Sequence, residues 1–362
     1  MLKRLLTPFL LSLLAASGLL LGGCQPSDPA ADLQADYLSR MARALEQAPP
    51  PAFDRQLLLA LRPPAKRELR QSAADSRISL LNLLVDTADC PRLRVLISER
   101  NSVLGKVMQP SHQLAYEMAL IDELQSCLTH TRPHTRSNDW HSELASLLRR
   151  KQQELPLHYW NLFASDELRQ QLRFAEHGTP PNVNQTQWLD SLTSLAELGE
   201  QLHSMPAPSA ASLDALLQPL ANTEAGGQLL HSLVRLTYTL EQGTQLLNQR
   251  ATDKPLCPIG KPTPQARIVQ NVMVKYYAGQ LQPYLAQVSQ QAQQWHSQLA
   301  RLRRLPNAPL ALQGYLAELD QRWQRFEHAT QAHVQAWQDT LRSCQLAPGQ
   351  SGWQSSASID QR

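Results

Sequence analysis

The chain has 362 residues, of which 34 are Lys or Arg and 31 are Asp or Glu, so its formal net charge is +3. This length suits one large domain or two small ones. Nucleic-acid binding needs a basic footprint, and attraction to anionic lipid headgroups needs a basic cluster. The sequence indicates neither, because no segment carries a long run of one charge sign.

The first 23 residues have the features of a signal peptide. Lys3 and Arg4 precede an uncharged, mostly apolar run, Leu5–Leu21, and small residues lead from it to Cys24. The stretch 21–24 resembles the bacterial lipobox, whose cysteine is acylated and becomes the first residue. The alternatives are a membrane-spanning helix or an unlipidated signal peptide. A membrane span needs about 20 apolar residues, and this run is shorter.

The lipobox resemblance implies where the mature chain is held. It implies a diacylated and then N-acylated Cys24, and two or more acyl chains anchor a protein stably. Residue 25 is Gln and not the Asp that usually retains lipoproteins in the inner membrane. We therefore expect a lipid anchor in the outer membrane, with the protein facing the periplasm. Residues 24–31 are predicted to form a tether.

The remaining chain is predicted to be an elongated all-α domain over residues 32–344. Apolar residues recur at spacings of three and four almost throughout, which is typical of helices. The first helix is expected at 32–47. Residues 345–362 are polar and rich in Gly and Ser, and a disordered tail is predicted there. Between two predicted hairpins, helical segments are expected at 137–154, 165–176, 185–204, 212–221 and 224–249.

The first hairpin is predicted at about residues 91–128. One helix runs from Pro91 to about Met108, a break follows, and a second helix runs from Ser111 to about Leu128. Each helix would be about 26 Å long. Two equal antiparallel helices would bring Cys127 back beside Cys90.

A longer hairpin is predicted at about residues 264–343. Apolar residues in both halves alternate spacings of four and three, and prolines near residue 306 break the pattern. Each helix would be about 55 Å long, and Cys344 would return beside Cys257. Pro283 should kink the first of these helices.

The four cysteines after Cys24 predict two disulfides, because even numbers pair in oxidising compartments. Three pairings are possible, and the hairpins favour Cys90–Cys127 and Cys257–Cys344. The alternative is a metal site formed by Cys127, His130, His134 and His141. That cluster has no CxxC pair and contains Pro133, so neither a metal nor a cofactor is expected.

A candidate polar site is predicted in the first hairpin. Arg100 falls on an apolar helix stripe, and a buried guanidinium needs a carboxylate. Glu117 or Glu123 on the partner helix would supply it, with Glu99 and Asn101 beside it. The alternatives are an ion pair that fixes the hairpin register, a polar ligand pocket, or a catalytic site. Gly105 suggests close approach of a neighbouring helix.

Tryptophans 295, 323 and 337 fall on apolar stripes and are expected in the core. Trp160 is a better candidate for a surface aromatic, although packing is favoured there too. No catalytic motif is recognised, so no catalytic residue is predicted.

A family resemblance rests on the stretch from Cys90 to Cys127. Its pattern of Cys-Pro-Arg-Leu, residues 97–107, Ser111, Tyr116-Glu117 and Cys127 resembles a family of uncharacterised Gram-negative lipoproteins, the domain of unknown function 3080. The resemblance implies an all-helical lipoprotein and supplies no catalytic residues.

Our leading hypothesis from the sequence is a non-enzymatic helical scaffold or adaptor for envelope proteins, anchored in the outer membrane. Its protein partner is unidentified. A second hypothesis is a carrier of a small amphiphile lodged between helices, which requires a sizeable apolar cavity. A third is an enzyme with a site near Arg100, which requires convergent polar side chains in an open cleft.

Overall fold

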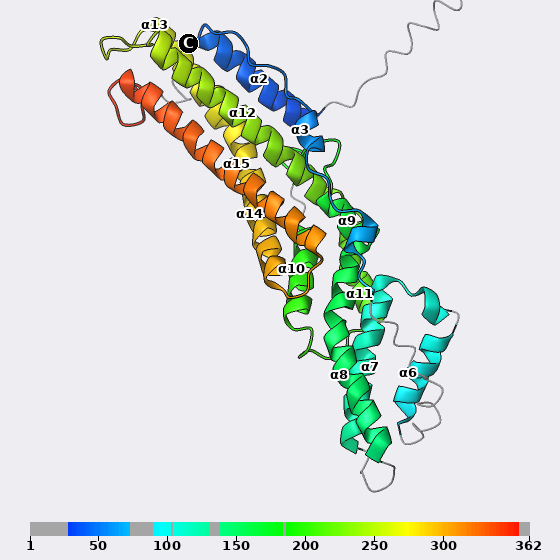
Figure 1. Ribbon diagram of the computed structural model, residues 1–362. Helices are drawn as coiled ribbons and strands as arrows, with labels where there is room; N and C mark the ends of the chain where they lie inside the picture. The colour runs from blue at the N-terminus through cyan, green and yellow to red at the C-terminus, as the bar shows by residue number, and fades with distance from the viewer. Residues whose placement is uncertain (1–27, 73–89, 103, 131–137, 184–185, 355–362) are drawn as a thin grey trace, which may run out of the picture.

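A computed structural model describes residues 28–72, 90–102, 104–130, 138–183 and 186–354 (Figure 1). Within these ranges the regular elements are helices and no strand is present, so the all-α prediction is confirmed. The same ranges contain no helix with the length and apolar character needed to cross a membrane. The signal segment 1–23 and Cys24 lie outside the described residues.

Short loops separate most of the helices, and several helices follow one another directly. The bounds are α2 (Pro29–Ala44), α3 (Gln56–Leu59), α4 (Lys66–Leu69), α6 (Pro91–Asn101), η2 (Leu104–Val107), α7 (Pro110–His130), α8 (Asn138–Asn161), η4 (Leu162–Ala164), α9 (Asp166–Leu172), α10 (Gln187–Glu200), α11 (Ala210–Ala221), α12 (Ala225–Asp253), α13 (Pro264–Val272), η5 (Met273–Leu281), α14 (Gln282–Arg304) and α15 (Leu310–Ser343).

One half of the molecule, which we call the long-helix bundle, contains α2, α12, α15 and the continuous rod α13–η5–α14 (Figure 1). Helices α2, α12 and α15 run in the same direction, and the rod runs against them. The direction follows from paired contacts that advance together along the helices: Gln34 with Thr239, Glu46 with Arg250, Glu241 with Arg325, and Thr244 with His333.

The rod changes helix type in front of Pro283. Residues Met273–Leu281 form a nine-residue π-helix, and the amide of Gln282 donates to the carbonyl of Tyr277, five residues earlier. A proline has no amide hydrogen, and its ring clashes with the preceding turn of an α-helix. A kink was predicted at Pro283, and the structure has a wider, π-helical turn directly before it.

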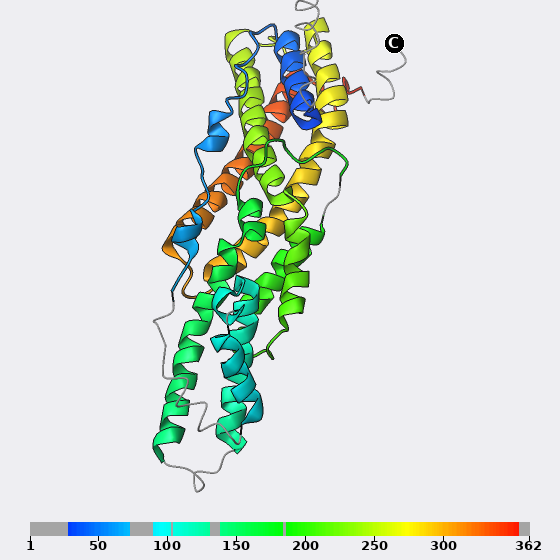
Figure 2. The same cartoon turned by 90° about the vertical axis from the view of Figure 1, so that its right-hand side faces the viewer.

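The opposite end, which we call the α6–α8 end, has a small core separate from the main one. Figure 2 shows it below the bundle. Helices α9, α10 and α11 lie between the two and share the main core with the bundle. Together these parts give an elongated molecule. The core of the α6–α8 end consists of Cys90, Leu93, Ile97, Tyr116, Leu120, Leu124, Cys127, Trp140, Leu144 and Leu147.

Both predicted hairpins are present, with two differences. Helix α6 ends at Asn101 and is shorter than the expected 91–108, so the two helices of the first hairpin are unequal. Helix α15 packs mainly against α12 and less against α14, its hairpin partner. The reason is that α12 is buried on most of its circumference and forms the centre of the bundle.

The ends of the domain extend beyond the expected 32–344. Helix α2 begins at Pro29, inside the predicted tether 24–31, because the Oδ1 of Asp28 caps it by accepting from the amide of Ala31 (3.0 Å). In the predicted tail 345–362, Leu346 is fully buried, and its carbonyl accepts from the side chain of Gln270 (3.3 Å). Residues 355–362 lie outside the described residues.

Candidate functional site

The structure does not bring the four predicted polar residues together. Glu99 and Asn101 are exposed at the end of α6. Arg100 is half-buried, and its guanidinium donates to the backbone carbonyl of Gly105. In the described part of the chain Arg100 does not pair with Glu117, which lies on α7 against α8 and pairs with Lys151. The predicted ion pair of Arg100 with Glu117 is therefore wrong, and Glu123, the other carboxylate considered, lies 3.2 Å from Arg92.

The local chemistry of Ser102 and Gly105 explains why Arg100 misses the expected stripe. The Ser102 hydroxyl donates to the carbonyl of Glu99 (2.7 Å) and accepts from the amide of Gly105 (3.0 Å). These bonds end α6 and fold the next residues back onto it. A Cβ at position 105 would overlap the carbonyls of Glu99 and Arg100. Gly105 therefore allows close approach to the end of its own helix, and not to a neighbouring one.

Glu117 belongs instead to a buried group of charged side chains, which we call the ionic cluster: Glu117, Lys151, Glu154 and His158. The last three are spaced by three and four residues, so they share one face of α8. The Lys151 Nζ lies 3.1 Å from Glu117 Oε2 and 3.5 Å from Glu154 Oε2. The His158 Nε2 lies 3.7 Å from Glu117 Oε1. Glu117 is only 2% exposed.

The ionic cluster carries more negative than positive charge. Two carboxylates face one ammonium, and burial lowers the pKa of His158, although the Glu117 carboxylate opposes that shift. The imidazole is therefore neutral at neutral pH. Among the residues described, Glu117 Oε2, Glu154 Oε2 and both ring nitrogens of His158 have no well-aligned hydrogen-bond partner. Such groups can exchange protons, but the open hollow of about 560 Å³ beside α8 lies on another face, at Gln153 and Leu157.

A second buried polar group lies in the long-helix bundle, and we call it the neutral network: Tyr37, Thr244, His333 and Trp337. Tyr37 Oη lies 2.6 Å from His333 Nε2 and accepts from Trp337 Nε1 (2.9 Å). The Thr244 hydroxyl donates to the carbonyl of Leu240 (2.8 Å). It therefore accepts from His333 Nδ1 (3.2 Å), and His333 Nε2 accepts from Tyr37.

This arrangement keeps His333 uncharged. Its side chain is fully buried, and burial lowers its pKa to about 3. A Cβ at Gly243 would lie 2.6 Å from the His333 ring, so the glycine makes room for the imidazole. Trp337 was expected in the core, as were Trp295 and Trp323, and all three are buried. His333 was missed, although its position four residues before Trp337 on the same stripe was a usable signal.

Trp160 was considered as a surface aromatic, although packing in the core was favoured. It is fully buried, and its Nε1 donates to the carbonyl of Pro306 (2.8 Å).

Ser111, His112 and Asp214 form a contact between α7 and α11. The Asp214 carboxylate accepts from Ser111 Oγ (2.8 Å) and lies 2.8 Å from His112 Nε2, and both contacts lower its pKa, that with His112 more. A hydrolytic triad needs the imidazole beside the hydroxyl. Here the carboxylate lies between them, so the group holds two helices together.

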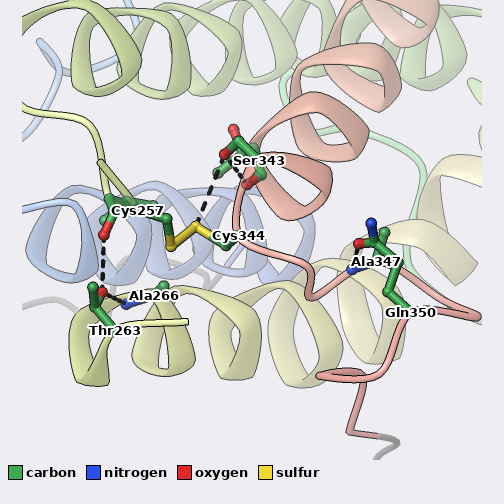
Figure 3. Close-up of a disulfide and its surroundings, with 9 residues drawn as sticks. Cys257, Thr263, Ala266, Ser343, Cys344, Ala347 and Gln350 are labelled. Atoms are coloured by element: carbon green, nitrogen blue, oxygen red, sulfur yellow. Dashed lines mark hydrogen bonds between the residues drawn. A yellow bond between two sulfur atoms is a disulfide. The ribbon is translucent and has the colours of Figure 1, made fainter. Parts of the chain in front are cut away.

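The two disulfides are those predicted. Cys90 pairs with Cys127 and Cys257 pairs with Cys344, with Cα–Cα distances of 5.7 and 5.2 Å. Figure 3 shows the second, which joins the loop after α12 to the end of α15, beside Thr263 at the start of α13. Cys127 therefore has no thiolate to offer a metal, and His134 lies outside the described residues.

Two adjoining hollows follow the surface between α12 and α15, and we call them the α12–α15 groove. Their volumes are about 70 and about 400 Å³, and they share Glu241, which makes two bonds to Arg325 (2.7 and 2.8 Å). The remaining lining residues are Leu57, Val234, Thr237, Tyr238, Arg322, Thr244, Gln245, Asn248, Gln249, His328, Ala329 and Ala332.

The chain matches the model of one known protein family. A family model described as "Protein of unknown function (DUF3080)" matches residues 34–348. The chain belongs to this family. The resemblance seen between Cys90 and Cys127 thus extends over most of the domain. Neither a curated protein nor a solved structure matches the chain.

Proposed function

We propose that the protein is a non-enzymatic, lipid-anchored scaffold of the bacterial envelope that binds another envelope protein. Its anchor would be Cys24 in the outer membrane, and its body would face the periplasm. The sequence of residues 1–24 supports the anchor. The pairing of all four other cysteines supports an oxidising compartment such as the periplasm.

The α12–α15 groove is the observation that carries the binding role. It runs along two parallel helices of 29 and 34 residues, and it combines alanines with charged and amide side chains. Helical partners bind such grooves through residues spaced by three and four. The carrier hypothesis is less supported, because the hollows of about 560 and 400 Å³ along α8 and α12–α15 open to solvent.

Photo-crosslinking in cells tests the scaffold. A photoreactive residue replaces exposed Gln245 or His328 in the groove, and exposed Ser146 on α8 is the matched control site. We expect one envelope protein to be captured at both groove positions and not at the control. Capture of the same abundant proteins at all three positions would contradict the proposal.

The anchor needs a separate test. We expect Cys24→Ser to abolish both fatty-acid labelling and membrane retention, while the two disulfides still form. Unchanged attachment of this variant to membranes would show that Cys24 is not the anchor.

A further inference from the structure

The chain leaves the described domain on the side of the molecule, away from either end of its long axis (Figure 1). Asp28 caps α2 and lies 3.7 Å from His177, and Ala30 lies against Gly178, which packs on Ser232 of α12. From Ser232 to Asp253, the end of α12, is about 32 Å at 1.5 Å per residue. The Cys257–Cys344 disulfide follows that end, and the Cys90–Cys127 disulfide lies at the opposite end of the molecule (Figure 1).

The reach of the connecting chain is short. Three residues separate Cys24 from Asp28, and the four steps between their Cα atoms span at most about 14 Å in a fully extended chain. The headgroup layer takes up about 5–7 Å of this reach on each face of a bilayer. Asp28 must therefore stay within about 10 Å of the headgroup surface. Neither end of the molecule can stand on the membrane while Asp28 is held this close, because the nearer end is about 32 Å away.

We propose that the protein lies along the bilayer, with the side that carries Asp28 against the lipid headgroups and α3 in contact with them. This inference rests on the proposed anchor at Cys24. An elongated body that is held within about 10 Å of a plane by a point on its side, about 32 Å from its nearer end, lies along that plane. Figure 2 faces this side, with the start of α2 in dark blue and α3 in lighter blue.

The residues of α3 suit a lipid interface. Leu59 is 63% exposed, whereas Leu57 is 39% exposed and lines the α12–α15 groove. Arg55 immediately precedes α3, and its guanidinium reaches the carbonyl of Glu176, next to the His177 that faces Asp28. Apolar side chains enter the boundary between headgroups and acyl chains, and arginines bind the lipid phosphates.

The same side also carries acidic groups, including Asp54 and Glu176, both exposed. Charge attraction alone would therefore not hold this surface on an anionic membrane. The contact is shallow, and it depends on the covalent anchor for its persistence.

Two exposed apolar residues elsewhere provide matched controls. Ile259 is 79% exposed beside the Cys257–Cys344 disulfide, and Leu310 is 84% exposed at the start of α15. In the proposed orientation Leu59 alone of these three contacts lipid. A molecule that stood on its disulfide end would place Ile259 there instead.

The test uses the full lipidated protein in vesicles of phosphatidylethanolamine and phosphatidylglycerol. Leu59→Cys, Ile259→Cys and Leu310→Cys are each labelled with an environment-sensitive fluorophore, and a quencher is carried on the lipid acyl chains. We expect the Leu59 probe to lose most of its fluorescence and the two control probes to keep theirs. Quenching that is equal at all three positions, or strongest at Ile259, would overturn the inference.

The anchor is checked first on the same samples, by the mass of the Cys24 peptide and by flotation with vesicles. Lipidated protein that floats but keeps Leu59 fluorescent contradicts only the orientation. Protein that carries no lipid contradicts the anchor, and the orientation falls with it.

Discussion

The long-helix bundle and the α6–α8 end bury polar groups in different ways. The neutral network of the bundle pairs Tyr37, Thr244, His333 and Trp337 without any charge. The ionic cluster at the other end buries Glu117 and Glu154 against one lysine. One oxygen of each carboxylate has no well-aligned hydrogen-bond donor among the described residues. A closed neutral network stabilises a core and fixes helix register. A buried charge group contributes little net stability, yet it is costly to break.

The largest expected effect tests whether the two regions unfold together. The Cys257–Cys344 disulfide closes a loop with a sequence separation of 87, and Cys90–Cys127 one of 37. In the chain-entropy model, removing the first by serine substitution lowers the free energy of unfolding by about 4.5 kcal/mol, measured with denaturant. Removing the Cys90–Cys127 disulfide should cost about 4 kcal/mol. We expect this loss to destabilise only the α6–α8 end.

Hydrogen exchange distinguishes the two variants. With Cys90 and Cys127 replaced, exchange should accelerate in α6 and in the end of α7 that carries Leu124 and Cys127, because these residues belong to the small core. Helices α12 and α15 belong to the main core and should keep their protection. Equal acceleration in α12 would show that the molecule unfolds as one unit.

The second effect tests the ionic cluster. Lys151→Met leaves two buried carboxylates without their ammonium and should lower the free energy of unfolding by about 3–5 kcal/mol. Adding Glu117→Gln and Glu154→Gln removes the uncompensated charge and should recover most of that loss in the same denaturation experiment. A single variant as stable as the parent would mean that the cluster is not charged in the folded protein.

The third effect is a pH dependence that arises in the neutral network. His333 has a folded-state pKa of about 3, whereas the unfolded chain binds that proton below about pH 6.5. Stability from this residue is therefore complete above pH 6.5 and is lost as the pH falls. Between pH 6 and 4, acidification should lower the free energy of unfolding of both proteins, but less in His333→Gln. The slope of the variant should be smaller than that of the parent by about 1.4 kcal/mol per pH unit.

Tyr37→Phe is the matched control for this pH experiment. It removes the hydroxyl that bonds His333 but keeps the imidazole, so it should lower stability by about 1–3 kcal/mol while retaining the steeper slope. Parallel curves for His333→Gln and the parent would contradict a neutral, buried His333.

The smallest effect concerns the predicted polar site. Glu99 and Asn101 are exposed, so Glu99→Gln and Asn101→Ala should each change the free energy of unfolding by no more than about 0.5 kcal/mol. A larger loss in thermal or denaturant unfolding would show that these two side chains of α6 stabilise the fold and are not simply solvated.

The helices and the two disulfides could be predicted from the sequence, whereas the pairing of polar side chains between helices could not. The spacing of apolar residues predicted the helices, and antiparallel hairpins predicted both cysteine pairs. The position of Arg100 was wrong because a local bond from Ser102 ends α6 early. The partnership of Glu117 with Lys151 depends on how α7 meets α8, residues 34 apart, and no local pattern encodes it.

The connectivity of the disulfides has a consequence for how the molecule is made. Each cysteine pairs with its nearest neighbour in the chain after Cys24, first Cys90 with Cys127 and then Cys257 with Cys344. A chain that emerges N-terminus first into an oxidising space therefore presents each correct pair before the next cysteine arrives. Oxidation in order of emergence yields the native pairs, and no shuffling by an isomerase is needed.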